Sequence, residues 1–260
     1  MLKKLIKLNL NDLWLYLGVE GGVFLLLEVI LCCVMYFARP EDGITVCCIV
    51  MPILAGVVAL ISGITHVGVS FEQALRFGQT RRRAVGLTLG VMAFESAFGL
   101  ALGAVLAALE RFICPALWAR LAGLDGWVAG MDMGYWENAP LPGGNGFVTG
   151  CFFRNMSGEF LPMPENTLLV EVFTLEWYWW LLAFAAGLCG GLIAGAVIQR
   201  FGAKGGWIIY GVCMAPVILG QLLPWERYEI TNWLFPLLGI LFAAGLIWSV
   251  WSMLHAVVRA

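Results

Sequence analysis

The sequence predicts an all-α, polytopic membrane protein with six transmembrane helices, both termini in the cytoplasm and a long external insert between the third and fourth helices. Three observations predict this fold class. Hydrophobic residues make up 61% of the 260 residues, charged residues make up 12%, and the mean hydropathy is +0.88, so the chain lacks the polar surface of a soluble globule. Several apolar windows are long enough to cross a bilayer. Basic residues and tryptophans are distributed unevenly between the connecting segments.

The first 14 residues combine basic and apolar side chains. Leucine and isoleucine recur at helical spacing beside three lysines, which predicts an N-terminal amphipathic helix on the cytoplasmic membrane surface. The same residues could instead be the charged start of the first span. Asn9, Asn11 and Asp12 interrupt the segment before any long apolar core, so we expect no cleaved signal peptide.

Six windows meet the requirement of roughly 20 mostly apolar residues for a helix that crosses a bilayer. They cover residues 14–38, 44–70, 87–110, 177–198, 207–223 and 233–253. Pro52, Pro216 and Pro236 lie in the second, fifth and sixth windows and can kink those helices. We therefore expect a single transmembrane domain over residues 1–260, with the insert at residues 111–176.

Charge orients these windows in the membrane. With both termini inside, ten of the 15 basic residues fall on the cytoplasmic side: Lys3, Lys4, Lys7, Arg76, Arg81, Arg82, Arg83, Arg200, Lys204 and Arg259. The short loops carry this bias most cleanly, and such a bias sets the orientation of membrane proteins. Tryptophans near the window ends agree with the same topology, because they mark two membrane interfaces.

The insert at residues 111–176 is rich in Gly, Pro, Asn, aromatic and acidic residues. Residues 112–124 are typical of an amphipathic helix on the outer surface, and residues 137–150 have the turn residues of a hairpin or lariat. Residues 168–173 could be a strand or the lead-in to the fourth helix. A loop of this length is either functional or disordered, and its tryptophans favour order.

Cysteine usage leaves one redox question open. Six of the eight cysteines lie in apolar stretches, where they behave as small hydrophobic residues. Cys114 and Cys151 fall in the external insert, so they could form a disulfide or stay reduced.

The loop between the second and third windows is the most basic part of the chain. Phe71, Leu75 and Phe77 supply an apolar edge, and Gly78 is a break, within a short cytoplasmic helix over residues 71–85. Such a segment can dock into a groove on another protein, although an ordinary loop that binds lipid headgroups is the alternative. The residues that we expect at the contact are Phe71, Glu72, Leu75, Arg76, Phe77, Gly78, Thr80, Arg81, Arg82 and Arg83.

The pattern Phe-x-x-Ala-Leu-Arg-Phe-Gly-x-Thr-Arg-Arg-Arg, residues 71–83, resembles the loop after the second span in bacterial type-2 ABC transporter permeases of the peptide and antibiotic export group. In that family the loop is a coupling helix that contacts a separately encoded ATPase subunit. The resemblance implies a permease of the bacterial cytoplasmic membrane that pairs with a second copy or a paralogue. It also implies export of an amphiphilic peptide, antibiotic or lipid-like compound, with ATP and Mg²⁺ bound by the partner ATPase and no cofactor in this chain.

The sequence contains no motif for covalent chemistry of its own. The string Gly-Ala-Lys-Gly-Gly around Lys204 lacks the Ser or Thr of an ATP-binding loop, so energy must come from a partner subunit or an ion gradient. His66 and His255 have no second ligand three or four residues away, and no nucleophile-elbow or zinc-protease motif is present. We therefore expect no catalytic residue, no metal site and no nucleic-acid partner, and we expect His66 at the membrane interface.

Three acids lie within the predicted spans, and a carboxylate in hydrocarbon must face protein or water, be protonated or find a donor. Glu28 and Glu95 lie well inside their spans, so they are our candidates for a polar translocation path. Glu20 is closer to the inner surface and could simply extend its carboxylate to it. A neutral acid bonded across a helix interface is an equally good reading of each.

Small residues predict where helices approach closely. Gly187, Gly191 and Gly195 repeat every four residues on the fourth window, and Gly99 and Gly103 do the same on the third. This spacing leaves bare backbone on one helix face for a neighbouring helix, within the bundle or across a dimer.

Two functions from different classes remain open at this stage. The preferred one is the transport subunit of an ATP-driven exporter. The alternative is an ATPase-independent membrane carrier that uses Glu28 and Glu95 as proton sites, or an immunity or sensor protein that binds a ligand through its external insert. An intramembrane enzyme would need a polar cluster that the sequence does not reveal.

Overall fold

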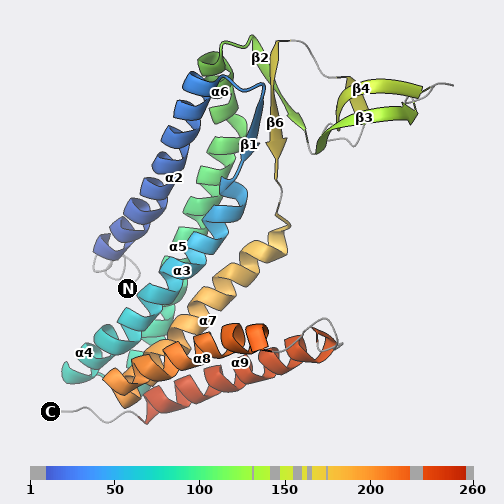
Figure 1. Cartoon of the computed structure of the whole chain (residues 1–260). Helices are drawn as coiled ribbons and strands as arrows, with labels where there is room; N and C mark the ends of the chain where they lie inside the picture. The colour runs from blue at the N-terminus through green and yellow to red at the C-terminus, as the bar shows by residue number, and fades with distance from the viewer. Residues whose placement is uncertain are drawn as a thin grey trace. The chain divides into compact units, whose positions relative to one another are not determined.

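A computed structural model describes residues 10–130, 132–140, 147–154, 160–162, 166–173, 175–222 and 231–255. Its helices are α2 (Leu10–Ala38), α3 (Cys47–Thr65), the π-helix η1 (His66–Ser70), α4 (Phe71–Arg76), α5 (Arg81–Phe112), α6 (Cys114–Ala122), α7 (Trp177–Phe201), α8 (Ala203–Leu222) and α9 (Thr231–Leu254) (Figure 1). Its strands are β1 (Asp42–Thr45), β2 (Gly126–Gly130), β3 (Asp132–Pro140), β4 (Phe147–Arg154), β5 (Phe160–Pro162) and β6 (Thr167–Val172).

Four of these helical stretches are long and apolar enough to cross a membrane: Leu13–Ala38, Cys47–Arg76, Arg81–Ala122 and Trp177–Phe201. A helix is the expected form of such segments, because in hydrocarbon it satisfies every backbone polar group internally. The last two predicted windows are also helical, in α8 and α9. The mostly helical, membrane-protein class is therefore confirmed, whereas the six-span layout and its orientation stay predictions. The predicted amphipathic helix lies almost wholly in residues 1–9, outside the described residues.

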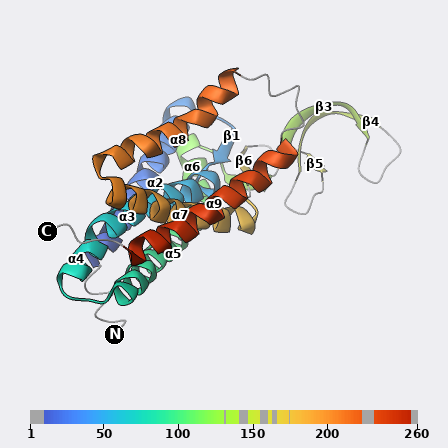
Figure 2. The same ribbon diagram turned by 90° about the horizontal axis from the view of Figure 1, so that it is seen from below.

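The predicted insert contains strands, so the all-α class is too simple. The expected helix of residues 112–124 is present as α6, and β3 and β4 form an antiparallel hairpin that continues to β5 (Figure 2). A register shift lies between Trp136 and Ala139. Residues 168–173 largely coincide with β6, so the strand was the correct one of the two alternatives.

A second sheet joins the insert to the loop after α2. Its order is β1-β6-β2, with β6 parallel to both neighbours (Figure 1). Strand β1 was not predicted. It has only four residues, and its partner β6 lies more than a hundred residues away, as in the pair Asp42 and Leu169.

The chain forms two compact units, which we describe separately. The loop unit comprises Met1–Leu13, Ala55–Gly99 and Leu181–Ala260. The insert unit comprises Trp14–Leu54 and Leu100–Trp180. Helices α2, α3, α5 and α7 contribute residues to both units.

In the loop unit, the core joins η1 and α4 to α5, α7 and α9. Its fully buried members include Phe71, Ala84, Ala196 and Met253. Helix α7 approaches α3 through its glycine row. A Cβ atom on Gly191 would lie 2.9 Å from the backbone oxygen of Leu60, and one on Gly187 would collide with the backbone oxygen of Gly56. Bare backbone is therefore required at these crossings.

In the insert unit, α6 packs on β2 and β6 through the fully buried Trp118. The helix ends at Gly123, whose φ of +82° is the left-handed conformation that favours glycine at a helix C-terminus. A second cluster in the same unit packs Cys47 and Met51 of α3 against Leu106 and Ala107 of α5.

Candidate functional site

The basic loop, residues 71–83, is a short helix followed by a tight turn. Helix α4 continues directly from η1, and its last turn is closed by Gly78, whose φ is +76°. Helix α5 then begins at Arg81. The predicted helix over residues 71–85 is thus two helices with a turn between them.

The two phenylalanines of the basic loop have opposite environments. Phe71 is fully buried in the core of the loop unit, and Leu75 packs partly against the same core. Phe77 is 85% exposed, at the junction between α4 and the turn. One face of the loop is therefore anchored to the helices behind it, while an aromatic side chain projects from the other.

The positive charge of the basic loop is exposed and largely unneutralised. Arg76 pairs with Glu72 one helical turn earlier at 3.2 Å, and both side chains face solvent. Thr80 and the three following arginines are exposed, and within the described part of the chain no carboxylate pairs with Arg81, Arg82 or Arg83. These arginines occupy the first turn of α5, where the helix dipole disfavours positive charge. Their position costs helix stability and favours a partner that carries negative charge.

A polar cluster lies behind this loop, within the loop unit. The Nε2 atom of His66 is 2.8 Å from Oε2 of Glu95, and Oγ of Ser62 donates to the same oxygen at 2.8 Å. The Nδ1 atom of His66 is 3.1 Å from Oγ of Ser70. Glu95 is fully buried and His66 is 7% exposed, so both side chains lie against protein, and the position of His66 at the membrane interface stays a prediction.

The cluster depends on the π-helix, because η1 begins at His66 and ends at Ser70. Single π turns in helices often mark functional sites. The histidine between a serine and a carboxylate resembles the order of groups in a hydrolase triad. The cluster nevertheless lies within helices, where backbone N–H groups are used by the helix itself, and an acyl-transfer site needs free N–H donors for its oxyanion. The arrangement therefore favours proton binding over hydrolysis.

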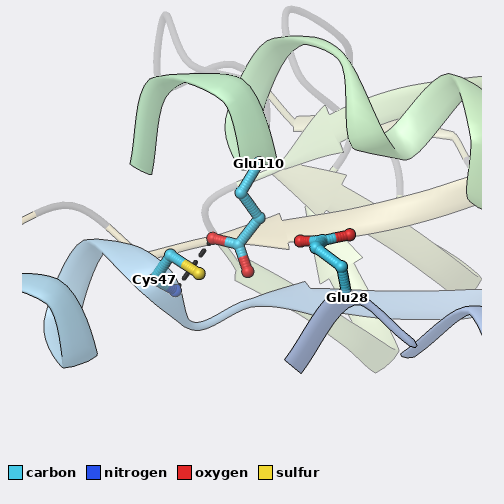
Figure 3. A group of neighbouring side chains, drawn as sticks. All are labelled: Glu28, Cys47 and Glu110. Atoms are coloured by element: carbon cyan, nitrogen blue, oxygen red, sulfur yellow. Dashed lines mark hydrogen bonds between the residues drawn. The ribbon is translucent and has the colours of Figure 1, made fainter. Parts of the chain in front are cut away.

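The other predicted acid, Glu28, belongs to a different cluster, in the insert unit. Its Oε2 atom accepts a hydrogen bond from Nε1 of Trp118 at 3.1 Å, whereas its Oε1 atom has no partner among the described residues. Glu110 of α5 and Cys47 of α3 lie beside it (Figure 3). Glu28 and Glu95 are therefore not joined by the structure into one site.

Glu20 differs from its sequence-based interpretation. Its side chain is fully buried, and neither carboxyl oxygen has a hydrogen-bond partner within the part of the chain that the structure describes. A Cβ atom on Gly103 of α5 would lie 3.5 Å from Oε2 of Glu20. The carboxylate faces protein, so the expectation that it extends to the surface is wrong.

The structure brings together residues that sequence reasoning missed. In the sequence, Glu110 is simply the last residue of an apolar window, next to Arg111. Ser62 and Cys47 lie inside another apolar window, and neither residue type by itself marks them as members of a polar site. The one available signal was the i, i+4 spacing of Ser62, His66 and Ser70, which places them on one helix face. The thiol of Cys114 is free, and the side chain of Cys151 lies outside the described residues, so the structure gives no support to a disulfide between them.

Comparisons with protein-family models, with curated proteins and with solved structures found no match to this chain. The geometry above is therefore the basis of the functional argument.

Proposed function

We propose that the chain is the membrane-spanning subunit of an ATP-driven ABC transporter, and that the basic loop couples it to a separate ATPase subunit. The observation that carries this proposal is the two-sided loop: Phe71 is buried in the helical core, while Phe77 is 85% exposed beside arginines that pair with no carboxylate among the described residues. A push on Phe77 and the arginines reaches α3 through η1, because α4 continues from η1 and η1 continues from α3. It reaches α5 directly, because α5 begins at Arg81. Such a segment can transmit force without chemistry of its own.

The proposed assembly contains two permease chains, this one and a second copy or a paralogue, with two ATPase subunits that bind ATP and Mg²⁺. Export of an amphiphilic peptide, antibiotic or lipid-like compound from a bacterial cytoplasmic membrane remains the proposed task. The support for it is the resemblance of residues 71–83, together with helices that are long and apolar enough to span a membrane. A buried carboxylate such as Glu95 would lie along the path between the loop and the spans that it moves.

A site-specific photo-crosslinker tests this proposal. We expect a crosslinker in place of Phe77 to capture a protein that binds and hydrolyses ATP in the native membrane. The matched control is Phe112, an exposed aromatic residue at the other end of α5 (65% exposed), which should give no such product. Crosslinks from position 77 to lipid alone would contradict the proposal.

A second candidate, a proton-coupled carrier without an ATPase, is favoured by the cluster of Ser62, His66 and Glu95. A buried histidine in contact with a buried carboxylate can take up and release a proton, and such groups inside membranes form proton relays. Transport that stops on collapse of the proton gradient and in Glu95→Gln, yet persists when cellular ATP is depleted, would favour this candidate over the first.

A further inference from the structure

The insert unit contains a second cluster of polar side chains, which the proposed function does not use. Glu28 of α2, Cys47 at the start of α3 and Glu110 near the end of α5 each offer one ligand atom, and these atoms lie within 4.8 Å of one another. Figure 3 shows the carboxyl groups of Glu28 and Glu110 facing each other, with the Cys47 side chain beside Glu110. All three residues are buried, with exposed fractions of 9%, 0% and 0%.

Helix geometry positions Glu110 and Cys47. The two carboxyl oxygens of Glu110 accept hydrogen bonds from the backbone N–H groups of Val46 at 3.0 Å and Cys47 at 2.8 Å. These N–H groups are at the start of α3, where helix donors lack internal partners, so the carboxylate caps the helix. The same cap brings the thiol of Cys47 next to the carboxylate.

One carboxyl oxygen of Glu28 lacks a hydrogen-bond donor among the described residues. Only its Oε2 atom is bonded, to Trp118, and the buried Oε1 atom has no hydrogen-bond partner among the described residues. A buried carboxylate oxygen without a donor is costly in free energy. Two carboxylates and the thiol of Cys47 therefore converge on one buried point. The thiol of Cys114 lies near Glu28 but outside this group.

We propose that Glu28, Cys47 and Glu110 form a binding site for a zinc ion, with water in the fourth position. Zn²⁺ is held tetrahedrally by carboxylate oxygens at about 2.0–2.2 Å and by thiolate sulfurs at about 2.3 Å. Bound ligand atoms are then roughly 3–4 Å apart, so the present cluster must contract by about 1 Å. The ion cancels the repulsion between two buried carboxylates. The thiol of Cys47 selects against Mg²⁺ and Ca²⁺, which prefer oxygen ligands alone.

A cavity adjoins the cluster on the side of Glu110. A pocket of about 190 Å³ is lined by Glu110 together with Thr45, Cys48 and Trp180, all within the insert unit. Zinc bound by the three side chains would fasten α2, α3 and α5 to one another. This inference depends only on the insert unit, so it stands or falls independently of the ATPase coupling.

Metal analysis of the purified full-length chain in detergent tests the site. After incubation with zinc chloride and dialysis, we expect one tightly held Zn²⁺ per chain and a higher Tm. Glu28→Gln and Cys47→Ser should each weaken zinc binding about tenfold or more. The control is Cys33→Ser, which removes an exposed thiol from the same helix as Glu28 and should retain zinc. Cobalt in place of zinc should give thiolate-to-metal absorption that Cys47→Ser removes.

Glu28→Gln keeps the size of the side chain and an acceptor for Trp118, so it is the variant that should fold even if Cys47→Ser does not. Circular dichroism and size-exclusion chromatography check folding. A native chain that retains no zinc would overturn the proposal. Equal zinc affinity in the native chain and in folded Glu28→Gln would overturn it as well, because the metal would then be bound elsewhere.

Discussion

Buried acids are the residues that deviate most from an apolar transmembrane helix. Glu20, Glu28, Glu95 and Glu110 are each at least nine-tenths buried, yet their partners differ. Glu95 contacts a histidine and a serine, and Glu110 contacts two backbone N–H groups. Glu28 has one bonded oxygen, and Glu20 has none among the described residues. A buried carboxylate without donors is costly, so these four sites are where ions, protons or movement have the largest energetic effect.

The pair of His66 and Glu95 should contribute strongly to stability. We expect His66→Ala to lower the free energy of unfolding by about 3 kcal/mol, because it leaves a buried carboxylate with one donor fewer. The matched control is Glu72→Ala, which breaks the exposed pair with Arg76 and should cost less than about 1 kcal/mol. Unfolding in detergent measures both. Equal losses of unfolding free energy in the two variants would show that the buried contact stabilises the fold no more than the exposed pair does.

The two phenylalanines of the basic loop should behave in opposite ways. Phe71→Ala should lower the free energy of unfolding by about 3–5 kcal/mol, since it empties a fully buried position. Phe77→Ala should change stability by about 0.5 kcal/mol or less, because the side chain is 85% exposed. Thermal denaturation of the two variants checks this. A large loss of stability in Phe77→Ala would show that the Phe77 side chain packs within the fold, and it would contradict the role of Phe77 as a docking residue.

Sequence alone identifies some of these residues and not others. Glu28 and Glu95 are recognisable, because a charge within an apolar window is costly wherever it lies. The role of Glu110 is not recognisable from the sequence. Its carboxylate accepts hydrogen bonds from the backbone N–H groups of Val46 and Cys47, which lie 64 and 63 residues away in the chain. The contact of His66 was missed for the same reason: its partner Glu95 is 29 residues away, on another helix. Such contacts exist only once the helices pack.

At the scale of helices and strands, the glycine row of α7 sets the distance between α7 and α3. The i, i+4 spacing predicted a close approach, and the structure supplies the partner. Gly191 lies against Leu60 and Gly63, and Gly195 lies against Val67. A sequence can show that a helix face is bare, but it cannot show which neighbour occupies it.

This crossing is sensitive to a single methyl group. Gly187→Ala should destabilise the chain by about 1–3 kcal/mol, because its Cβ atom would collide with the backbone oxygen of Gly56, which cannot turn away. Gly190→Ala is the control. Its Cβ atom would meet only the flexible end of Leu60 at 3.4 Å, and alanine favours the helix, so stability should stay level or rise by up to about 1 kcal/mol. The same loss in both variants, measured by unfolding in detergent, would contradict this packing.

The insert was partly predictable at this scale. Local signals predicted α6 and left the β3–β4 hairpin and β6 each as one of two alternatives, because amphipathic spacing and turn residues act over a few positions. The parallel β1-β6-β2 sheet was not predictable, since its strands are short and come from distant segments. Its central strand shows four buried residues, Leu168, Leu169, Val170 and Val172, rather than simple alternation. That pattern is typical of a strand covered on both faces.

For the whole molecule, composition established the membrane class, and the bias of basic residues led to the orientation. We expect a membrane-impermeant thiol reagent to label Gln79→Cys from the cytoplasmic side and Asp125→Cys from the external side. Both positions are outside the apolar windows, and the background should lack the exposed Cys33. Labelling of both positions from one side would contradict the predicted topology.

The central claim is that the basic loop transmits force from an ATPase. Its most direct test is the ATP hydrolysis rate of the assembly purified with its ATPase from native membranes. We predict that Phe77→Ala and the charge reversal Arg81→Glu, Arg82→Glu, Arg83→Glu leave the chain folded but abolish substrate-stimulated hydrolysis or release the ATPase. Unchanged assembly and unchanged stimulated hydrolysis in both variants would contradict the account.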